Sequence, residues 1–187
     1  MMTSRTYGLL AGLAAMLLAA TGLGAAPATE APAQFVQRLF AVYADSSAWW
    51  ANADTPAGRK ADETYRNDVY AKFYDPAFVK LMDDNGALAG AKNAGADLDY
   101  DPVCQCQDSG GIYRYVSGAP KGSFFDAKVT DNAADQKPWT LVLQKTPAGW
   151  RLYDVVDTSG SVRTRLTRHN ACLRKVKTET AAEACIA

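Results

Sequence analysis

Residues 139–156 read WTLVLQKTPAGWRLYDVV, and this stretch predicts a β-hairpin. Apolar side chains alternate with more polar ones through its first half, which is the period of an antiparallel strand with one protected face. The Thr-Pro-Ala-Gly segment at 146–149 separates two β-favouring runs and has the composition of a turn. We therefore expect two antiparallel strands, over residues 139–145 and 150–156.

Further strands precede this hairpin and a helix follows it. Residues 112–116 and 124–130 are short β-favouring runs bounded by Gly, Pro and Asn/Asp turns. Downstream, Ser161 is suited to cap a helix that carries Val162 and Leu166 on its inner side. The second half of the chain is thus expected to form an antiparallel sheet and a closing helix.

The region before the sheet has the three- and four-residue periodicity of helices. A first core helix is expected after Pro32 and runs toward the pair Trp49 and Trp50. Its apolar stripe consists of Phe35, Val36, Leu39, Phe40 and Tyr43. Paired indoles at a helix end either fill a gap in the core or present an aromatic binding surface, so both are candidate binding residues.

Two more helices are expected before the strands. Pro and Gly in residues 52–59 interrupt the first helical pattern, and Asp62 then opens a second helix. Asp75, a natural N-cap followed by proline, opens a third helix, which Gly86 is expected to end. Residues 87–96 are small and glycine-containing and predict a loop or a weak helical turn.

Composition limits the classes of partner. The chain has 187 residues, of which 48% are hydrophobic and 21% charged, as in an ordinary globular domain. Lys plus Arg and Asp plus Glu number 20 each, so the formal net charge is zero. No overall field would attract nucleic acid or an anionic membrane, and we expect neither as a partner.

The first residues predict an exported protein. Arg5 precedes an Ala/Leu/Gly-rich apolar stretch, and small residues suited to signal peptidase follow it, so residues 1–28 are interpreted as a signal peptide. An uncleaved anchor is the alternative, but the stretch barely reaches spanning length. No cysteine follows that run to carry a lipid, so we expect a periplasmic or secreted protein without a membrane anchor. Helices followed by strands then predict one α+β domain over 29–187, with a core at about 33–174 and a tail at 178–187.

The four cysteines suit an oxidising compartment. Cys172 with Cys185 is the favoured disulfide, because it would hold the C-terminal tail against the closing helix. Cys104 and Cys106 leave three alternatives, which are a redox-active pair, two buried thiols, or a bridge from one of them to the C-terminal pair.

No metal site and no cofactor is expected. His169 is the only histidine and is interpreted as a partly buried, hydrogen-bonded side chain, which leaves zinc without a ligand set. Alternate aspartates at positions 97, 99, 101 and 108 are typical of calcium loops, but Pro102 stands where an EF-hand loop needs glycine. The acidic loop is therefore expected to cap backbone amides.

Four motifs carry a resemblance to a known family. They are Tyr74-Asp75-Pro76 with Phe78 and Leu81, Asp99-Tyr100-Asp101-Pro102 followed by Gln107-Asp108, Gly149-Trp150-x-x-Tyr153-Asp154-Val155, and Ser161-Val162-Arg163-x-x-Leu166. With the order of elements, they resemble an exported bacterial family of unknown function within the nuclear transport factor 2-like (cystatin-like) superfamily. The resemblance implies a cone-like fold, in which N-terminal helices pack into a curved antiparallel sheet, and it transfers no catalytic residue.

The resemblance also indicates where a site would lie. Enzymes of this superfamily, such as ketosteroid isomerases and scytalone dehydratases, work from the cavity of the cone with Asp, His or Tyr. The corresponding candidates in this chain are Tyr65, Tyr70, Asp108, Asp154 and Asp157. A carboxylate in an apolar pocket would gain the raised pKa that an acid or base requires. Trp49, Trp50, Tyr70, Asp101, Asp108 and Asp154 are the candidate cavity or binding residues.

Two functional hypotheses follow. The first is a non-enzymatic periplasmic binding module for a small molecule, or for an envelope protein in the manner of an inhibitor or immunity protein. The second is a small cavity-based hydrolase, isomerase or dehydratase that uses Asp and Tyr. The first leads because no catalytic set can be assembled from the sequence. Oligomeric state has no signal in the sequence.

Overall fold

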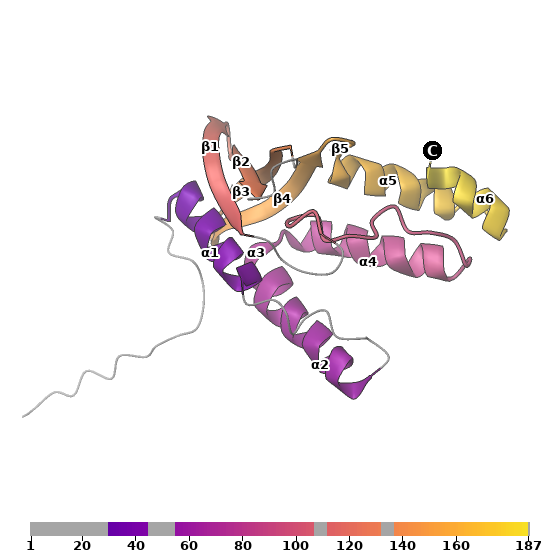
Figure 1. Cartoon of the computed structure of the whole chain (residues 1–187). Coiled ribbons are helices and arrows are strands. Elements are labelled where there is room, and N and C mark those ends of the chain that lie inside the picture. The colour runs from indigo at the N-terminus through magenta and orange to yellow at the C-terminus, as the bar shows by residue number, and fades with distance from the viewer. Residues whose placement is uncertain (1–29, 45–54, 107–111, 132–136, 187) are drawn as a thin grey trace, which may run out of the picture.

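The computed structural model describes residues 30–44, 55–106, 112–131 and 137–186. Figure 1 shows an α+β architecture, in which N-terminal helices pack against a five-stranded antiparallel sheet and a C-terminal helix follows. The α+β class expected from the sequence is thereby confirmed. The predicted signal peptide, the tryptophans at 49 and 50, and Asp108 lie outside the described residues.

Consecutive strands pair in chain order to form the sheet. They are β1 (Tyr113–Lys121), β2 (Phe124–Asp131), β3 (Trp139–Thr146), β4 (Gly149–Asp157) and the short β5 (Gly160–Ser161). The predicted hairpin is confirmed, with Thr146 paired to Gly149 across the turn. Gly149 has a φ of 104°, which glycine adopts without steric cost. A register shift between Val142 and Leu143 places one extra residue in β4.

The first strand is longer than the sequence predicts. It continues past Val116 to Lys121 and pairs with β2 along its length, apart from a register shift between Tyr115 and Ser117. Gly118 and Pro120 made this extension hard to recognise, because both residues weaken a strand assignment. Their place on an edge strand removes the conflict, since the outer side of such a strand has no neighbouring strand to bond.

Helices form the rest of the described fold. They are α1 (Pro32–Ala44), α2 (Pro56–Tyr65), η2 (Arg66–Tyr70), α3 (Ala71–Phe73), α4 (Pro76–Gly90), α5 (Val162–Leu173), α6 (Glu179–Glu183) and η3 (Ala184–Ile186). The apolar stripe of α1 is buried as predicted. Within the described residues, no helix has both the length and the apolar character needed to cross a membrane.

Two predicted helix boundaries are wrong. The second helix begins at Pro56 instead of Asp62, because Thr55 accepts a hydrogen bond from the Gly58 amide and proline suits the first turn. The third helix starts after the Asp75 cap as predicted, but it passes through Gly86 to Gly90. An isolated glycine weakens a helix without ending it, and packing of α4 against α5 maintains the helix here.

The core lies between the helices and the inner face of the sheet. From the sheet, Leu141, Leu143 and Leu152 are fully buried. Phe35 of α1 and Phe73 of α3 meet edge to face, with ring centroids 5.6 Å apart. In Figure 1 α4 and α5 run side by side beyond this core. That arrangement leaves the start of α4 facing the core and its later turns available to form the wall of a pocket.

The C-terminal tail packs on the end of α5. The predicted disulfide between Cys172 and Cys185 is confirmed, and it ties η3 back to α5. Ala182 of α6 is fully buried in a small cluster with Leu173 and Ala89. The tail is therefore a helical element with its own contacts.

Candidate ligand-binding pocket

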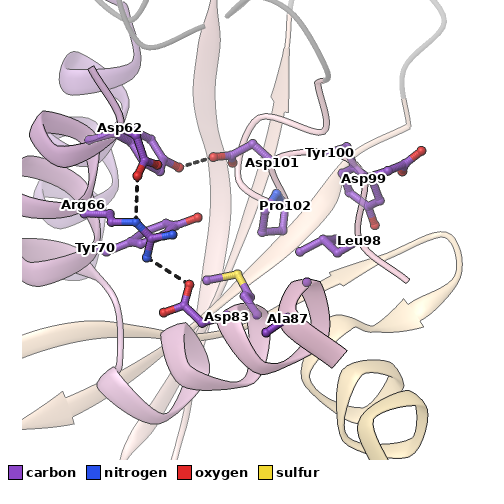
Figure 2. A pocket seen from close by; sticks show the side chains of 13 residues that line it. Asp62, Arg66, Tyr70, Asp83, Ala87, Leu98, Asp99, Tyr100, Asp101 and Pro102 are labelled. Carbon is purple, nitrogen blue, oxygen red and sulfur yellow. Dashed lines mark hydrogen bonds and ion pairs between the residues drawn. The ribbon is translucent and has the colours of Figure 1, made fainter. Parts of the chain in front are cut away.

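A pocket of about 600 Å³ lies between the α2–η2 helix, α4 and the segment 98–102 (Figure 2). Tyr65, Tyr70 and Asp101 form its floor. Asp62, Arg66 and Asp83 form its rim. The lining residues are Asp62, Tyr65, Arg66, Tyr70, Met82, Asp83, Gly86, Ala87, Leu98, Asp99, Tyr100, Asp101 and Pro102. Three successive segments of the chain, at 62–70, 82–87 and 98–102, therefore meet around one space.

A π-helical turn aligns the tyrosines of the floor. Residues 66–70 form η2, whose i→i+5 hydrogen bonding brings side chains five apart onto one face. Tyr65 and Tyr70 consequently meet with ring centroids 4.8 Å apart. Tyr70 meets Tyr74 at the same centroid separation. In an uninterrupted α-helix of 3.6 residues per turn, Tyr65 and Tyr70 would point in different directions.

Asp101 is the buried charge at the centre of this floor. One carboxylate oxygen accepts from the Val103 amide at 2.8 Å and from the Cys104 amide at 3.3 Å. The other accepts from the Tyr43 hydroxyl at 2.8 Å and from the Tyr65 hydroxyl. Burial raises the pKa of Asp101, and the hydrogen bonds from Tyr65 and Tyr43 oppose that rise. Four donors thus occupy the lone pairs of a carboxylate that is almost out of contact with water.

The turn that presents Asp101 is closed covalently. Cys104 and Cys106 are bonded to each other, which excludes two buried thiols and a bridge to the C-terminal pair, while redox activity of the pair stays a prediction. Within the same turn the Asp101 amide donates to the Cys106 carbonyl at 2.9 Å. The indole of Trp139 on β3 donates to the Val103 carbonyl at 3.0 Å and anchors the turn to the sheet. The disulfide within the turn and the contact of the turn with β3 together fix the position of Asp101.

The tyrosines around Asp101 keep their protons. Burial, followed by the charge of Asp101, raises the pKa of Tyr43, Tyr65 and Tyr74 well above the ordinary value. The pKa of Tyr70 is raised for the same two reasons. These hydroxyls act as hydrogen-bond donors at neutral pH and do not supply a tyrosinate base.

An arginine bridges the rim. Figure 2 shows Arg66 between two carboxylates, with Nε 3.1 Å from Asp62 and a terminal nitrogen 2.9 Å from Asp83. The guanidinium carbon is 5.8 Å from the centre of the Tyr70 ring. All three charged side chains are about half exposed. The bridge joins the α2–η2 helix to α4 across the pocket.

A second polar network holds the opposite wall. The Tyr100 hydroxyl donates to Asp157 at 2.6 Å and accepts from Arg165 at 2.9 Å. Arg165 also pairs with Asp157 at 2.9 Å and with Asp97 at 3.4 Å. Burial and the hydrogen bond to Asp157 raise the pKa of Tyr100 to about 12. These contacts fasten the segment 98–102 to α5 and β4.

The structure brings together only part of the predicted site. Tyr65, Tyr70 and Asp101 meet at the pocket floor. Asp154 lies elsewhere, because its carboxylate accepts from the Ser161 hydroxyl at 2.6 Å and the Arg163 amide at 2.8 Å and so supports the start of α5. It lines a second pocket, of about 500 Å³, together with Phe124 and Tyr153, so its role as a cavity residue stays a prediction. Asp157 lies behind the wall as the partner of Tyr100.

Sequence reasoning missed most of the lining, including Asp62, Arg66 and Asp83 at the rim and Gly86 in the wall. The three charged residues look like solvated helix surface, because each lies among other polar residues at helical spacing. A usable signal was the spacing of the tyrosines, which is five from 65 to 70 and four from 70 to 74. A five-residue step inside a helical pattern is the mark of a π turn.

The single histidine lies outside the pocket. His169 is buried between α4 and α5, and its Nδ1 lies 2.8 Å from the amide nitrogen of Asn85. Burial lowers the pKa of His169. This agrees with the predicted hydrogen-bonded role. Among the described residues, no group of three or more His, Cys, Asp or Glu side chains is placed to hold a metal ion.

Comparisons of the chain with models of protein families, with curated proteins and with solved structures find no match. Function is therefore inferred from the pocket and its surroundings.

Proposed function

We propose that the chain is an exported, non-enzymatic binding module that holds a small molecule in the pocket between η2, α4 and the segment 98–102. The volume of about 600 Å³ supports this, since small-molecule sites span roughly 300–1,000 Å³. Apolar side chains such as Met82 and Leu98 share the lining with a few convergent polar groups. That mixture suits a ligand with an apolar body and one polar end.

One observation favours binding over catalysis: the carboxylate oxygens of Asp101 already accept hydrogen bonds from four donors. A general base needs a free lone pair within reach of the proton that it removes. Both Asp101 oxygens are already occupied by two backbone amides and two tyrosine hydroxyls. The raised pKa of Tyr65 removes a tyrosinate base as well. Asp101 and the tyrosines therefore maintain the structure of the floor and supply no general base. This favours a binding module over a hydrolase, isomerase or dehydratase.

The α4 wall supports the same proposal. Gly86 lies in the interior of α4, where glycine costs about 0.5–1 kcal/mol relative to alanine. A Cβ at this position would meet no atom within 4 Å, so packing does not require glycine there. With the neighbouring Ala87, it leaves room on the pocket side of the helix.

Export and the finer fold belong to the same proposal. Two disulfides agree with a periplasmic or secreted location, because such bonds persist in oxidising compartments. The order of helices before an antiparallel sheet agrees with the cone-like nuclear transport factor 2-like fold. The candidate ligand site would then lie on the helical side of the sheet.

Native mass spectrometry of the chain purified from a bacterial periplasm tests the proposal. We expect a small mass that leaves on gentle denaturation. Gly86→Leu should abolish that mass by filling the pocket. Gly90→Leu is the matched control, because Gly90 lies on the same helix, has open space at its Cβ, and does not line the pocket.

Two results would contradict small-molecule binding at this site. One is a bare wild-type chain that also gains no thermal stability across a library of small amphipathic compounds. The other is a bound mass that survives Gly86→Leu, which would place the ligand elsewhere. Circular dichroism of both variants establishes that they are folded.

A further inference from the structure

The lining of the pocket carries more acidic than basic side chains. We propose that its ligand is an organic cation, with an ammonium or guanidinium group on an apolar body. This inference rests on the proposed function and adds the chemical class of the ligand.

The charges of the lining favour a cation. Of the described residues that line the pocket, four are carboxylates and one, Arg66, is a cation. If Asp101 holds a proton, three carboxylates still face one guanidinium. An anion entering this space would meet carboxylates on every wall, and Arg66 is already bonded to Asp62 and Asp83. Electrostatic complementarity therefore selects positive ligands and rejects negative ones.

The rim already holds a cation in this way. The Arg66 guanidinium lies between the Asp62 and Asp83 carboxylates, with its central carbon 5.8 Å from the centre of the Tyr70 ring. Within about 6 Å, a cation is attracted by the face of an aromatic ring. Because the Arg66 side chain is 47% exposed and flexible, it can swing into water and leave both carboxylates to a ligand cation.

The interior suits the rest of such a ligand. Met82, Leu98 and Pro102 provide apolar surface behind the rim. Ammonium and guanidinium groups are donors without acceptors, and they match the carboxylate oxygens of the rim. An amine on an apolar body would therefore find partners for both of its ends.

Three probes of one shape separate charge from size. They are 2-phenylethylamine, 2-phenylethanol and phenylacetate, which are positive, neutral and negative at neutral pH. Titration of each into the full exported chain is followed by NMR. We expect the amine to bind at least about tenfold more tightly than the alcohol, and phenylacetate to bind most weakly. Binding of the amine should weaken with added salt, since the rim carboxylates are half exposed.

Variants of the rim test the assignment by the sign of their effects. Asp83→Asn should weaken amine binding about two- to fivefold, the range for a partly exposed ion pair. Arg66→Gln should strengthen amine binding by a similar factor, because it removes the competing cation, and should leave the alcohol unchanged. Asp68→Asn is the matched control, since Asp68 is a half-exposed acid on η2, beside Arg66 in the fold, that pairs with Lys72 and does not line the pocket.

Each other result overturns the inference. Equal binding of amine and alcohol that Gly86→Leu blocks would retain a small-molecule pocket and refute its preference for cations. Tight binding of phenylacetate that Arg66→Gln abolishes would reverse the charge of the ligand. If none of the three probes binds, the inference is wrong. A bare chain in native mass spectrometry that also gains no thermal stability from amphipathic compounds would refute the proposed function separately.

Discussion

Replacing Asp101 tests whether one buried carboxylate organises the pocket floor. Asp101→Ala leaves the amides of Val103 and Cys104 without an acceptor, at about 1–3 kcal/mol for each buried group. The hydroxyls of Tyr43 and Tyr65 are 2.9 Å apart and can bond to each other. Removal of a buried charge offsets part of the loss, so we expect the free energy of unfolding to fall by about 2–4 kcal/mol.

The isosteric variant separates hydrogen bonding from charge. Asp101→Asn keeps one oxygen for the two amides, and its amino group can donate to hydroxyls that rotate to accept. At neutral pH we therefore expect a loss of less than about 1 kcal/mol. The difference between the two variants measures the acceptor role of the Asp101 turn.

The pH dependence has a definite sign. Burial raises the pKa of Asp101 above its ordinary 3.8, so the folded chain takes up a proton more readily than the unfolded chain. The contribution of this group to stability is full below pH 3.8 and is lost as pH rises through the folded pKa. Each unit of pKa difference corresponds to about 1.4 kcal/mol. Relative to wild type, Asp101→Asn should therefore be least stable near pH 4 and should recover toward pH 7.

Urea unfolding followed by tryptophan fluorescence, at several values between pH 4 and pH 7.5, measures all three proteins. Asp68→Asn is the control for a surface acid, because Asp68 and its partner Lys72 are both about half exposed. If Asp101→Ala and Asp101→Asn were equally stable at pH 7, the turn would not depend on an acceptor at this position. A gap between Asn and wild type that widens with rising pH would show that the pKa shift has the opposite sign.

Three further predictions concern other parts of the fold. Replacing both Cys172 and Cys185 with Ser should lower the free energy of unfolding by about 3 kcal/mol, measured by urea unfolding. An unchanged urea midpoint would mean that packing alone holds the C-terminal tail. Because burial lowers the pKa of His169, the unfolded chain takes up a proton at this residue more readily than the folded chain, so stability should fall as pH drops below about 6.5. His169→Gln should flatten that part of a plot of urea midpoint against pH, and an equal slope in the variant would assign the pH dependence to another group. Trp139→Phe removes the donor to the Val103 carbonyl and should cost about 1 kcal/mol by thermal unfolding, whereas an unchanged melting temperature would show that the sheet does not anchor the Asp101 turn.

Features encoded by neighbouring residues were predictable. The buried stripe of α1 follows from apolar spacing, and the starts of α4 and α5 follow from Asp75 with Pro76 and from Ser161. The β3–β4 hairpin follows from alternation on both sides of a Pro- and Gly-containing turn. Each of these depends on interactions between residues a few positions apart, which a sequence pattern reports directly.

Element ends and the role of Asp154 were less accessible. Gly86 was expected to end α4, but packing against α5 outweighs the modest helix cost of a glycine. Asp154 was a candidate cavity residue through the family resemblance; it lies outside this pocket, lines a second one, and accepts hydrogen bonds from Ser161 and Arg163. Which of two roles a carboxylate takes depends on the elements packed around it.

The sequence by itself determined the class of fold, the order of most elements and the C-terminal disulfide, because those follow from local periodicity, capping and cysteine placement. Only the tertiary structure decided the pocket. It required a π turn to align Tyr65 with Tyr70, a closed turn to aim Asp101 at them, and the approach of α4 to bring Asp83 to Arg66. These contacts join segments up to 58 residues apart, as between Tyr43 and Asp101, and no local pattern specifies which distant segments will meet.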